Sequence, residues 1–124
     1  MSDCLFCVPR GVVRENAFAY AARDSYAVSP GHTLVIPFRH CASFFDLTPE
    51  EYSACMALVC EERLEIDQAF RPDGYNIGVN IGQAGGQSIF HVHIHVIPRY
   101  AGDHPKPQGG VRHVLPDKAH YRRK

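Results

Sequence analysis

Three histidines alternate with apolar residues over a short stretch of the chain. His91, His93 and His95 are separated by Val92 and Ile94. Successive side chains of a β-strand point to opposite faces, so this spacing predicts three imidazoles on one face and a core on the other. A polar outer face that happens to use histidine is the alternative. Lys, Thr or Glu would serve equally well there, so the strict alternation favours a functional row.

Such a row could bind a metal ion or act on an anionic substrate. Neighbouring members would lie about 6.6 Å apart and could share an ion, but the outer pair, about 13 Å apart, could not reach one tetrahedral ion together. Imidazole donates, accepts or attacks near neutral pH, which suits a phosphate. Attack would form a phosphoramidate that water later cleaves, dividing one difficult displacement into two easier ones. Histidines and backbone amides could neutralise the phosphate charge, so this chemistry requires no catalytic metal.

The segment before the row is rich in glycine. Gly85 and Gly86 lack side chains, so their backbone N–H groups could approach an oxyanion closely. Ser88 adds a hydroxyl donor and Asn80 an amide. A flexible hairpin connection is the alternative interpretation. The position of the loop directly before the histidines favours a phosphate cradle.

The remaining pattern predicts the elements that must position these groups. Alternating and β-branched residues predict a hairpin over 12–22 and strands over 32–36, 75–79 and 89–97. Thr48, Pro49 and Glu51 form a capping-box sequence, and apolar spacings of three and four continue it as one amphipathic helix over 49–70. Strands in runs rather than alternating with helices predict an α+β fold, with an antiparallel sheet of about five strands and one long helix.

Composition limits the classes of protein that remain. The 124 residues are expected to form a single domain, 1–124, whose proline- and glycine-rich part from about residue 100 is an irregular tail. Thirteen basic and 13 acidic side chains argue against a nucleic-acid partner, and the basic cluster Arg122–Lys124 is interpreted as a solvated terminus. No apolar run is long enough for a membrane helix, and the first residues have neither the basic nor the apolar region of a secretory signal, so none is expected. An odd number of cysteines then favours reduced thiols in the cytoplasm, with Cys55 and Cys60 as small core residues.

Several blocks together resemble the histidine triad (HIT) superfamily of nucleotide hydrolases and transferases. Residues 91–97 resemble its H-x-H-x-H-x-x signature, and residues 31–37 and 80–95 resemble its other motif blocks without insertion. Pro98-Arg99 and residues 101–103 resemble the branch that contains dinucleoside polyphosphate hydrolases and the small bacterial members. The similarity covers nearly the whole chain, so it implies a HIT-like fold.

The resemblance implies a role for each polar residue. His93 would attack the α-phosphorus and form a covalent nucleotidyl-histidine, and His95 would bind the phosphate and help protonate the leaving group. His91 and His32 would orient and polarise the row. Asp24, which on its own would be interpreted as a turn residue, would accept hydrogen bonds from the ribose hydroxyls. The α-phosphate oxygens would be held by Asn80, Gly86 and Ser88.

The pair Cys4 and Cys7 has the spacing C-x-x-C, which fits a redox pair, half of a zinc site or chance. No thioredoxin-like βαβ pattern surrounds it, so redox chemistry is the least favoured. A tetrahedral zinc ion needs two further ligands. Small bacterial HIT proteins with the same motif imply structural zinc held by this pair together with His40 and His91.

We therefore expect a nucleotide hydrolase or nucleotidyl transferase that cleaves a purine dinucleotide, such as a diadenosine polyphosphate, through a covalent intermediate on His93. A nucleoside phosphoramidate hydrolase is the alternative substrate class. A zinc-binding interaction module without catalysis is the alternative from a different class. The resemblance also implies a homodimer, and neither a membrane nor a nucleic acid is an expected partner.

Overall fold

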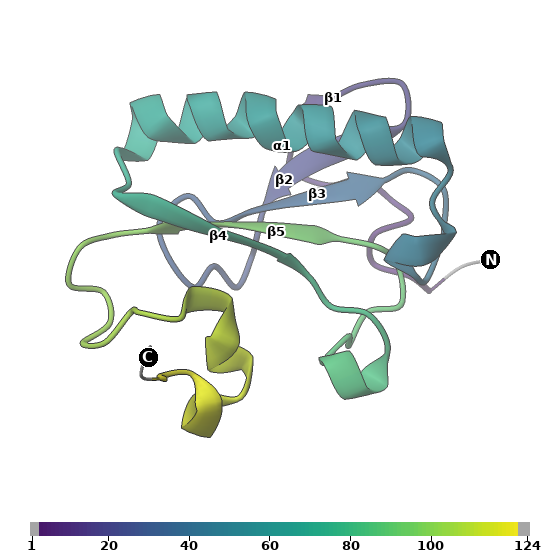
Figure 1. Cartoon of the computed structure of the whole chain (residues 1–124). Coiled ribbons are helices and arrows are strands. Elements are labelled where there is room, and N and C mark those ends of the chain that lie inside the picture. Colours follow the sequence, from purple (N-terminus) through teal and green to yellow (C-terminus); the bar gives the residue numbers. More distant parts are fainter. Residues whose placement is uncertain (1–2, 122–124) are drawn as a thin grey trace.

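A five-stranded antiparallel sheet carries one long helix across one of its faces (Figure 1). The computed structural model describes residues 3–121, so the basic cluster 122–124 lies outside the described part of the chain. The sheet order is β1-β2-β3-β5-β4, and each neighbouring pair is antiparallel. The predicted α+β class is confirmed. The strands are β1 (Val12–Glu15), β2 (Ala19–Arg23), β3 (Thr33–Pro37), β4 (Gly74–Val79) and β5 (Ile94–Arg99).

The helix α1 (Pro49–Phe70) has the bounds that its end signals predict. The Thr48 hydroxyl accepts a hydrogen bond from the Glu51 amide at 3.1 Å, and the Glu51 carboxylate accepts one from the Thr48 amide at 2.9 Å. Two amides of the first turn are thereby satisfied. At the other end Arg71 adopts the left-handed conformation, with φ of 52°, and Pro72 follows. The chain therefore cannot continue the helix and turns back into β4.

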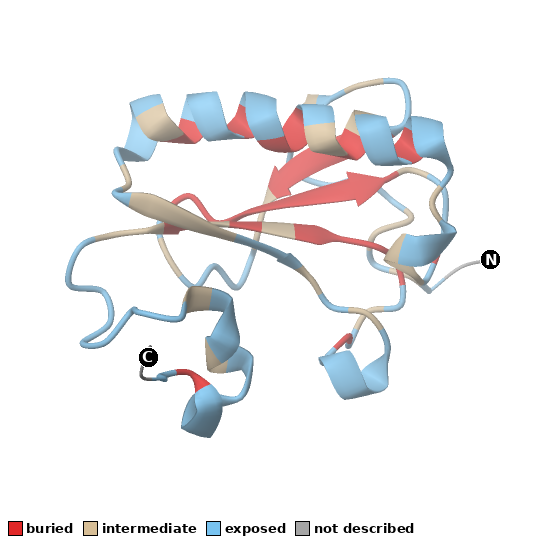
Figure 2. Cartoon of the chain, viewed as in Figure 1, coloured by how far each residue is buried: buried red, intermediate tan, exposed pale blue. Residues whose placement is uncertain are grey.

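The two faces of the sheet have different cores. Alternate residues of β2, β3 and β5 pack against α1, and Figure 2 shows the buried positions along the helix side that faces the sheet. The opposite face carries a smaller apolar cluster, against which Phe6 and Phe38 pack. This second face is where a ligand can reach the sheet, because α1 covers the first. The buried members of the smaller apolar cluster are Tyr20, Ala22, Leu34 and Ile36.

The last strand begins later than its pattern predicts. The alternation from Ile89 predicts a strand over 89–97, whereas β5 begins at Ile94, which pairs with both β3 and β4. Before this residue the chain leaves the ladder, and the Val92 amide donates to the carbonyl of Cys41 at 2.8 Å. His91 and His93 therefore precede the strand, and the prediction that one strand face carries all three histidines is wrong.

The C-terminal segment contains more regular structure than its composition predicts. Two short 3₁₀ helices, Gly110–Val114 and Pro116–Lys118, follow a turn fixed by the Arg99–Asp103 ion pair. This segment also contains three histidines. His104 and His120 are exposed and His113 is half-buried. The His113 ring contacts the other two edge to face, with centroids 5.0 Å from His104 and 5.2 Å from His120.

The two cysteines of α1 differ in environment. Cys55 is fully buried against the sheet, as predicted. Cys60 is exposed, so its prediction as a core residue is wrong. Five residues of an α-helix correspond to about 500°, which turns Cys60 roughly 140° away from the direction of Cys55. Within residues 3–121 no helix is both long and apolar enough to span a membrane.

Removing the helix cap should destabilise the fold without touching the histidines. Replacing Thr48 by Ala removes an acceptor for a first-turn amide, so we expect a loss of about 1 kcal/mol in the free energy of unfolding. That corresponds to a drop of roughly 2–5 °C in melting temperature. Thermal unfolding followed by circular dichroism measures it. The Thr48→Ser variant keeps a capping hydroxyl and should melt close to the parent, and equal losses in both variants would contradict the cap.

Candidate active site

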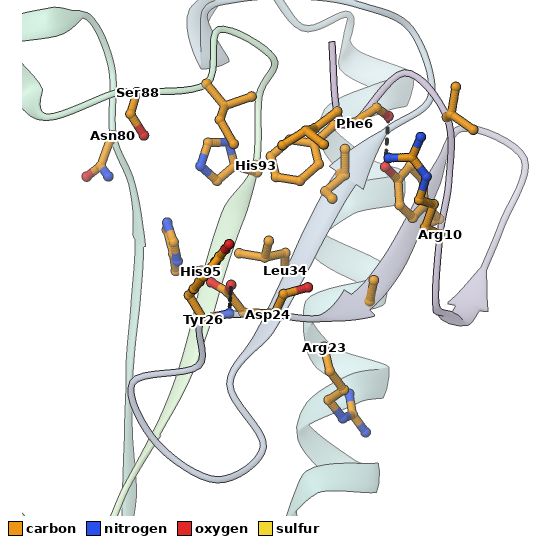
Figure 3. A pocket seen from close by; sticks show the side chains of 17 residues that line it. Phe6, Arg10, Arg23, Asp24, Tyr26, Leu34, Asn80, Ser88, His93 and His95 are labelled. Atoms are coloured by element: carbon orange, nitrogen blue, oxygen red, sulfur yellow. Dashed lines mark hydrogen bonds between the residues drawn. The ribbon is translucent and has the colours of Figure 1, made fainter. Parts of the chain in front are cut away.

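A cavity of about 360 Å³ opens on the sheet face opposite α1. Leu34 and Ile36 of β3, with Tyr20 of β2, supply part of its apolar surface. His93, just before β5, and His95, within β5, also line it (Figure 3). Its size and its mixed lining are typical of a small-molecule site. Five of the predicted site residues line it together: Asp24, Asn80, Ser88, His93 and His95.

One backbone hydrogen bond fixes the chemistry of the His93 ring. Nδ1 lies 2.8 Å from the backbone carbonyl oxygen of His91. A carbonyl only accepts, so Nδ1 of a neutral His93 carries the proton and Nε2 carries the lone pair. The ring is buried, with 8% of its residue surface exposed, yet it lines the cavity. His93 can therefore present a nucleophilic nitrogen to a ligand.

A second chain of hydrogen bonds gives His95 the opposite tautomer. The Val28 amide donates to Nδ1 of His32 at 3.1 Å, so the proton of a neutral His32 is on Nε2. That nitrogen lies 2.9 Å from Nδ1 of His95, which must accept. The remaining proton of a neutral His95 is then on Nε2. The rings of His93 and His95 are adjacent, with centroids 5.2 Å apart, so the site pairs a lone-pair nitrogen with an N–H donor.

Burial favours the neutral forms of His95 and His32. It lowers the pKa of His95 to about 4, with smaller contributions from neighbouring His93 and His32, while Asp24 opposes the shift. Burial also lowers the pKa of His32, and Asp24 again opposes it. An anion placed beside His95 would favour its charged form and raise its pKa. The site can thus take up a proton when a phosphate enters.

Asp24 lies in a turn and also lines the cavity. One carboxylate oxygen accepts from the Tyr26 amide at 2.9 Å, which is an Asx turn. The other lies 3.4 Å from Nε2 of His32, and the side chain lines the cavity. The turn therefore fixes a carboxylate at the rim of the cavity, where it can accept hydrogen bonds from a ligand.

The glycine loop differs from the predicted phosphate cradle. The amides of Gly85 and Gly86 donate within the loop, to Gly82 at 3.1 Å and to Gln83 at 3.0 Å. Gly86 is not among the residues that line the cavity, so its role as a phosphate ligand stays a prediction. Ser88 and Asn80 line the cavity with polar side chains.

Sequence reasoning missed Gln87, which braces this loop. Its buried amide accepts from the Gly82 backbone at 2.9 Å and donates to the carbonyls of Ala42 and Ile89 at 2.7 and 3.2 Å. The loop is thereby tied to the segment after β3. One glutamine between a glycine and a serine gives no periodic signal, which is why the sequence alone did not single it out.

Sequence reasoning also missed Phe6, which stands between the two cysteines. Its ring centroid lies 5.0 Å from that of His93, and Figure 3 shows it beside His93 on the side away from Asn80. The C-x-x-C spacing draws attention to the thiols. The apolar residue that the thiols enclose is the one that contacts the candidate nucleophile.

The second predicted cluster converges next to the cavity. Nδ1 of His91 lies 3.4 and 3.6 Å from the sulfurs of Cys4 and Cys7 and 3.3 Å from Nδ1 of His40, and the Cys7 sulfur lies 3.2 Å from that nitrogen of His40. All four donor atoms lie within 4.8 Å of one another. A tetrahedral zinc ion with ordinary bond lengths separates two nitrogens by about 3.3 Å and a sulfur from a nitrogen by about 3.5 Å. The donor set therefore fits zinc in both chemistry and spacing.

His91 is oriented for this cluster. Its Nε2 donates to the carbonyl of Pro37 at 2.8 Å, so a neutral ring has its lone pair on Nδ1, which faces the thiols. Burial lowers the pKa of His91, which keeps the ring in this neutral form. The side chain thus faces the metal cluster, and the contact of this residue with His93 is made by the backbone carbonyl.

Comparisons with known proteins agree with this geometry. The family model described as the HIT domain matches residues 7–102, so the chain belongs to the histidine triad family. An AP-4-A phosphorylase from Mycobacterium tuberculosis is 39% identical over 93 residues, which cover 74% of this chain. The chain spans only 48% of the length of that relative.

Two further relatives carry informative names. An adenosine 5'-monophosphoramidase from Schizosaccharomyces pombe is 33% identical over 103 residues, covering 78% of this chain and 74% of that protein. A zinc-bound histidine triad family protein from Mycobacterium smegmatis has a TM-score of 0.75 and 32% identity, covering 84% of this chain and 80% of the other. A nucleotide-processing enzyme is therefore the class of protein that the family and the site indicate.

The lowered pKa of His95 should make the fold sensitive to mild acid. The unfolded chain binds this proton near pH 6.5 but the folded chain only near pH 4, so stability falls as pH decreases through that window. Urea unfolding at pH 7 and pH 5 measures the loss. A His95→Asn variant lacks the titrating group and should lose less stability between the two values. An equal loss in parent and variant would show that His95 does not contribute.

Proposed function

We propose that this protein cleaves purine dinucleotides at the α-phosphate, with a diadenosine polyphosphate as substrate, through a covalent nucleotidyl-histidine on His93. The observation that carries the proposal is the pairing of tautomers, in which His93 presents a lone pair and His95 an N–H to one cavity. The name of the mycobacterial relative supports the substrate class.

The reaction has two steps. Nε2 of His93 attacks the α-phosphorus, an N–P bond forms, and the bond from phosphorus to the leaving oxygen breaks. The bound phosphate raises the pKa of His95, which takes up a second proton from solvent and gives its Nε2 proton to that oxygen. Water then attacks phosphorus, its proton passes to His95, and the N–P bond breaks to release the nucleoside monophosphate. An acceptor other than water would make the same intermediate a nucleotidyl transfer.

The neighbouring groups supply binding. Ser88 and Asn80 face the phosphate side of the cavity as donors, and Asp24 at the rim accepts from ribose hydroxyls. The apolar surface of Leu34, Ile36 and the Phe6 ring accommodates a purine base. The phosphate, the ribose and the base of a nucleotide thus each have side chains of suitable chemistry in the cavity.

A nucleoside phosphoramidate is the alternative substrate, favoured by the fission-yeast relative's name. The same attack by His93 would break a P–N bond, and His95 would protonate the leaving amine. Product analysis on a panel of diadenosine polyphosphates and adenosine phosphoramidate separates the two. Faster turnover of the phosphoramidate would reassign the substrate but keep the mechanism.

The covalent step is tested by removing the nucleophile. We expect His93→Gly to lower turnover at least about 10⁴-fold whatever the leaving group, because the covalent route itself is lost. Nucleotide binding should survive, since Asn80, Ser88 and Asp24 remain. Steady-state kinetics with a poor and a good leaving group measure the loss, and His104→Gly in the exposed tail is the matched control.

The intermediate itself can be trapped. Parent protein mixed with substrate and quenched in alkali should carry one nucleotidyl group on His93, detected by mass spectrometry. Activity of His93→Gly within tenfold of the parent would contradict the covalent route. Absence of both adduct and turnover in protein with full zinc occupancy would favour the interaction module.

We further propose that the cluster of Cys4, Cys7, His40 and His91 binds structural zinc, which the zinc-bound mycobacterial homologue supports. When bound, the ion would supply cross-links between the N-terminal segment and the sheet. Protein purified without chelator should contain about one zinc per chain by elemental analysis, and Cys4→Ser should contain much less. Zinc-free parent protein from such a preparation would contradict this assignment.

A further inference from the structure

The loop that carries the two thiols is also a wall of the cavity. Residues 4–8, here called the thiol loop, contribute Leu5, Phe6 and Val8 to the cavity lining. Within the described chain this loop lies outside every strand, and more than half of the surface of Leu5 and Val8 is exposed. Part of the apolar surface offered to a ligand thus stands on a segment that the sheet does not contain.

The four metal donors join this loop to the rest of the site. Cys4 and Cys7 bracket Phe6, whereas His40 follows β3 and His91 precedes β5. An ion shared by the four would bind the loop to the sheet from both sides of Phe6. Without an ion the same atoms are joined by thiol contacts of 3.2–3.6 Å, and a thiol is a weak hydrogen-bonding group.

The Phe6 backbone has a further attachment. The Tyr20 hydroxyl donates to the Phe6 carbonyl at 2.8 Å. That bond positions the loop over the apolar face of the sheet. Phe6 also contacts His91 with its ring, at 6.2 Å between centroids, so it touches both the candidate nucleophile and a candidate metal ligand.

We propose that metal and nucleotide bind this chain with positive coupling, because the metal orders the thiol loop as a wall of the nucleotide cavity. This proposal rests on the proposed function and adds regulation of the same site. When the metal has already ordered the thiol loop, no binding free energy of the nucleotide is lost in ordering it. The affinity for the nucleotide is therefore higher when the metal is bound. Equilibrium linkage then requires the nucleotide to raise metal affinity by the same factor.

The test measures both affinities. AMP binding is measured by calorimetry on zinc-loaded and on chelator-treated protein, and zinc affinity is measured in zinc buffers with and without saturating AMP. We expect the dissociation constant for AMP to be about tenfold larger without zinc. The dissociation constant for zinc should be larger by the same factor without AMP. Equal AMP affinity in the two forms would overturn the coupling.

A variant locates the coupling in the loop. Phe6→Ala keeps all four metal donors, so it should still contain one zinc per chain. In this variant AMP should bind the zinc-loaded protein about tenfold more weakly than it binds the parent, and the difference between loaded and metal-free protein should shrink. Thr48→Ala, which weakens α1 instead, should keep the parental coupling factor.

The outcomes separate this proposal from the one on which it rests. If the zinc-loaded parent binds no AMP, the nucleotide site itself is wrong. If it binds AMP with the same affinity in the presence and absence of zinc, only the coupling is wrong. The same holds if the chain binds no zinc. If metal-free protein unfolds, the zinc-loaded Phe6→Ala comparison decides, because unchanged AMP affinity there would also overturn the coupling.

Discussion

The site depends on a constraint on proton positions. An imidazole has two nitrogens, and each of the four central histidines has one of them committed to a fixed partner. The His91 carbonyl makes Nε2 of His93 a lone-pair nitrogen, and the relay from Val28 through His32 makes Nε2 of His95 a donor. Four identical side chains therefore do different chemistry because the backbone around them differs.

This constraint explains why the fold brings three segments to one place. β3 supplies the residue that pairs with His95 in register, Leu34, and its end supplies the Pro37 carbonyl that orients His91. The loop that Gln87 braces supplies the polar side of the cavity. The helix α1 contributes from the other face, where it covers Ile94 and Val96, the two neighbours of His95.

Local signals predicted what local interactions determine. The bounds of α1 follow from Thr48, Glu51 and the stop after Phe70, which act within a few residues. The alternation correctly placed Ile94 and Val96 in the core, but it could not show where strand pairing ends. The start of β5 is set by its neighbours, because Ile94 is the first residue that pairs with both β3 and β4. Likewise, the amides of Gly85 and Gly86 donate to Gly82 and Gln83 within a tight turn, and the spacing of the glycines does not predict these hydrogen bonds.

The contact between His91 and His93 has an evolutionary consequence. His93, the candidate nucleophile, is oriented by the carbonyl of residue 91, which every amino acid supplies, whereas the proposed metal site needs the imidazole of His91. Selection can therefore act on the two requirements separately, although they meet in one residue. A descendant of this chain could replace the thiols and the His91 ring by apolar groups that pack the loop in place, and its His93 would keep the same tautomer.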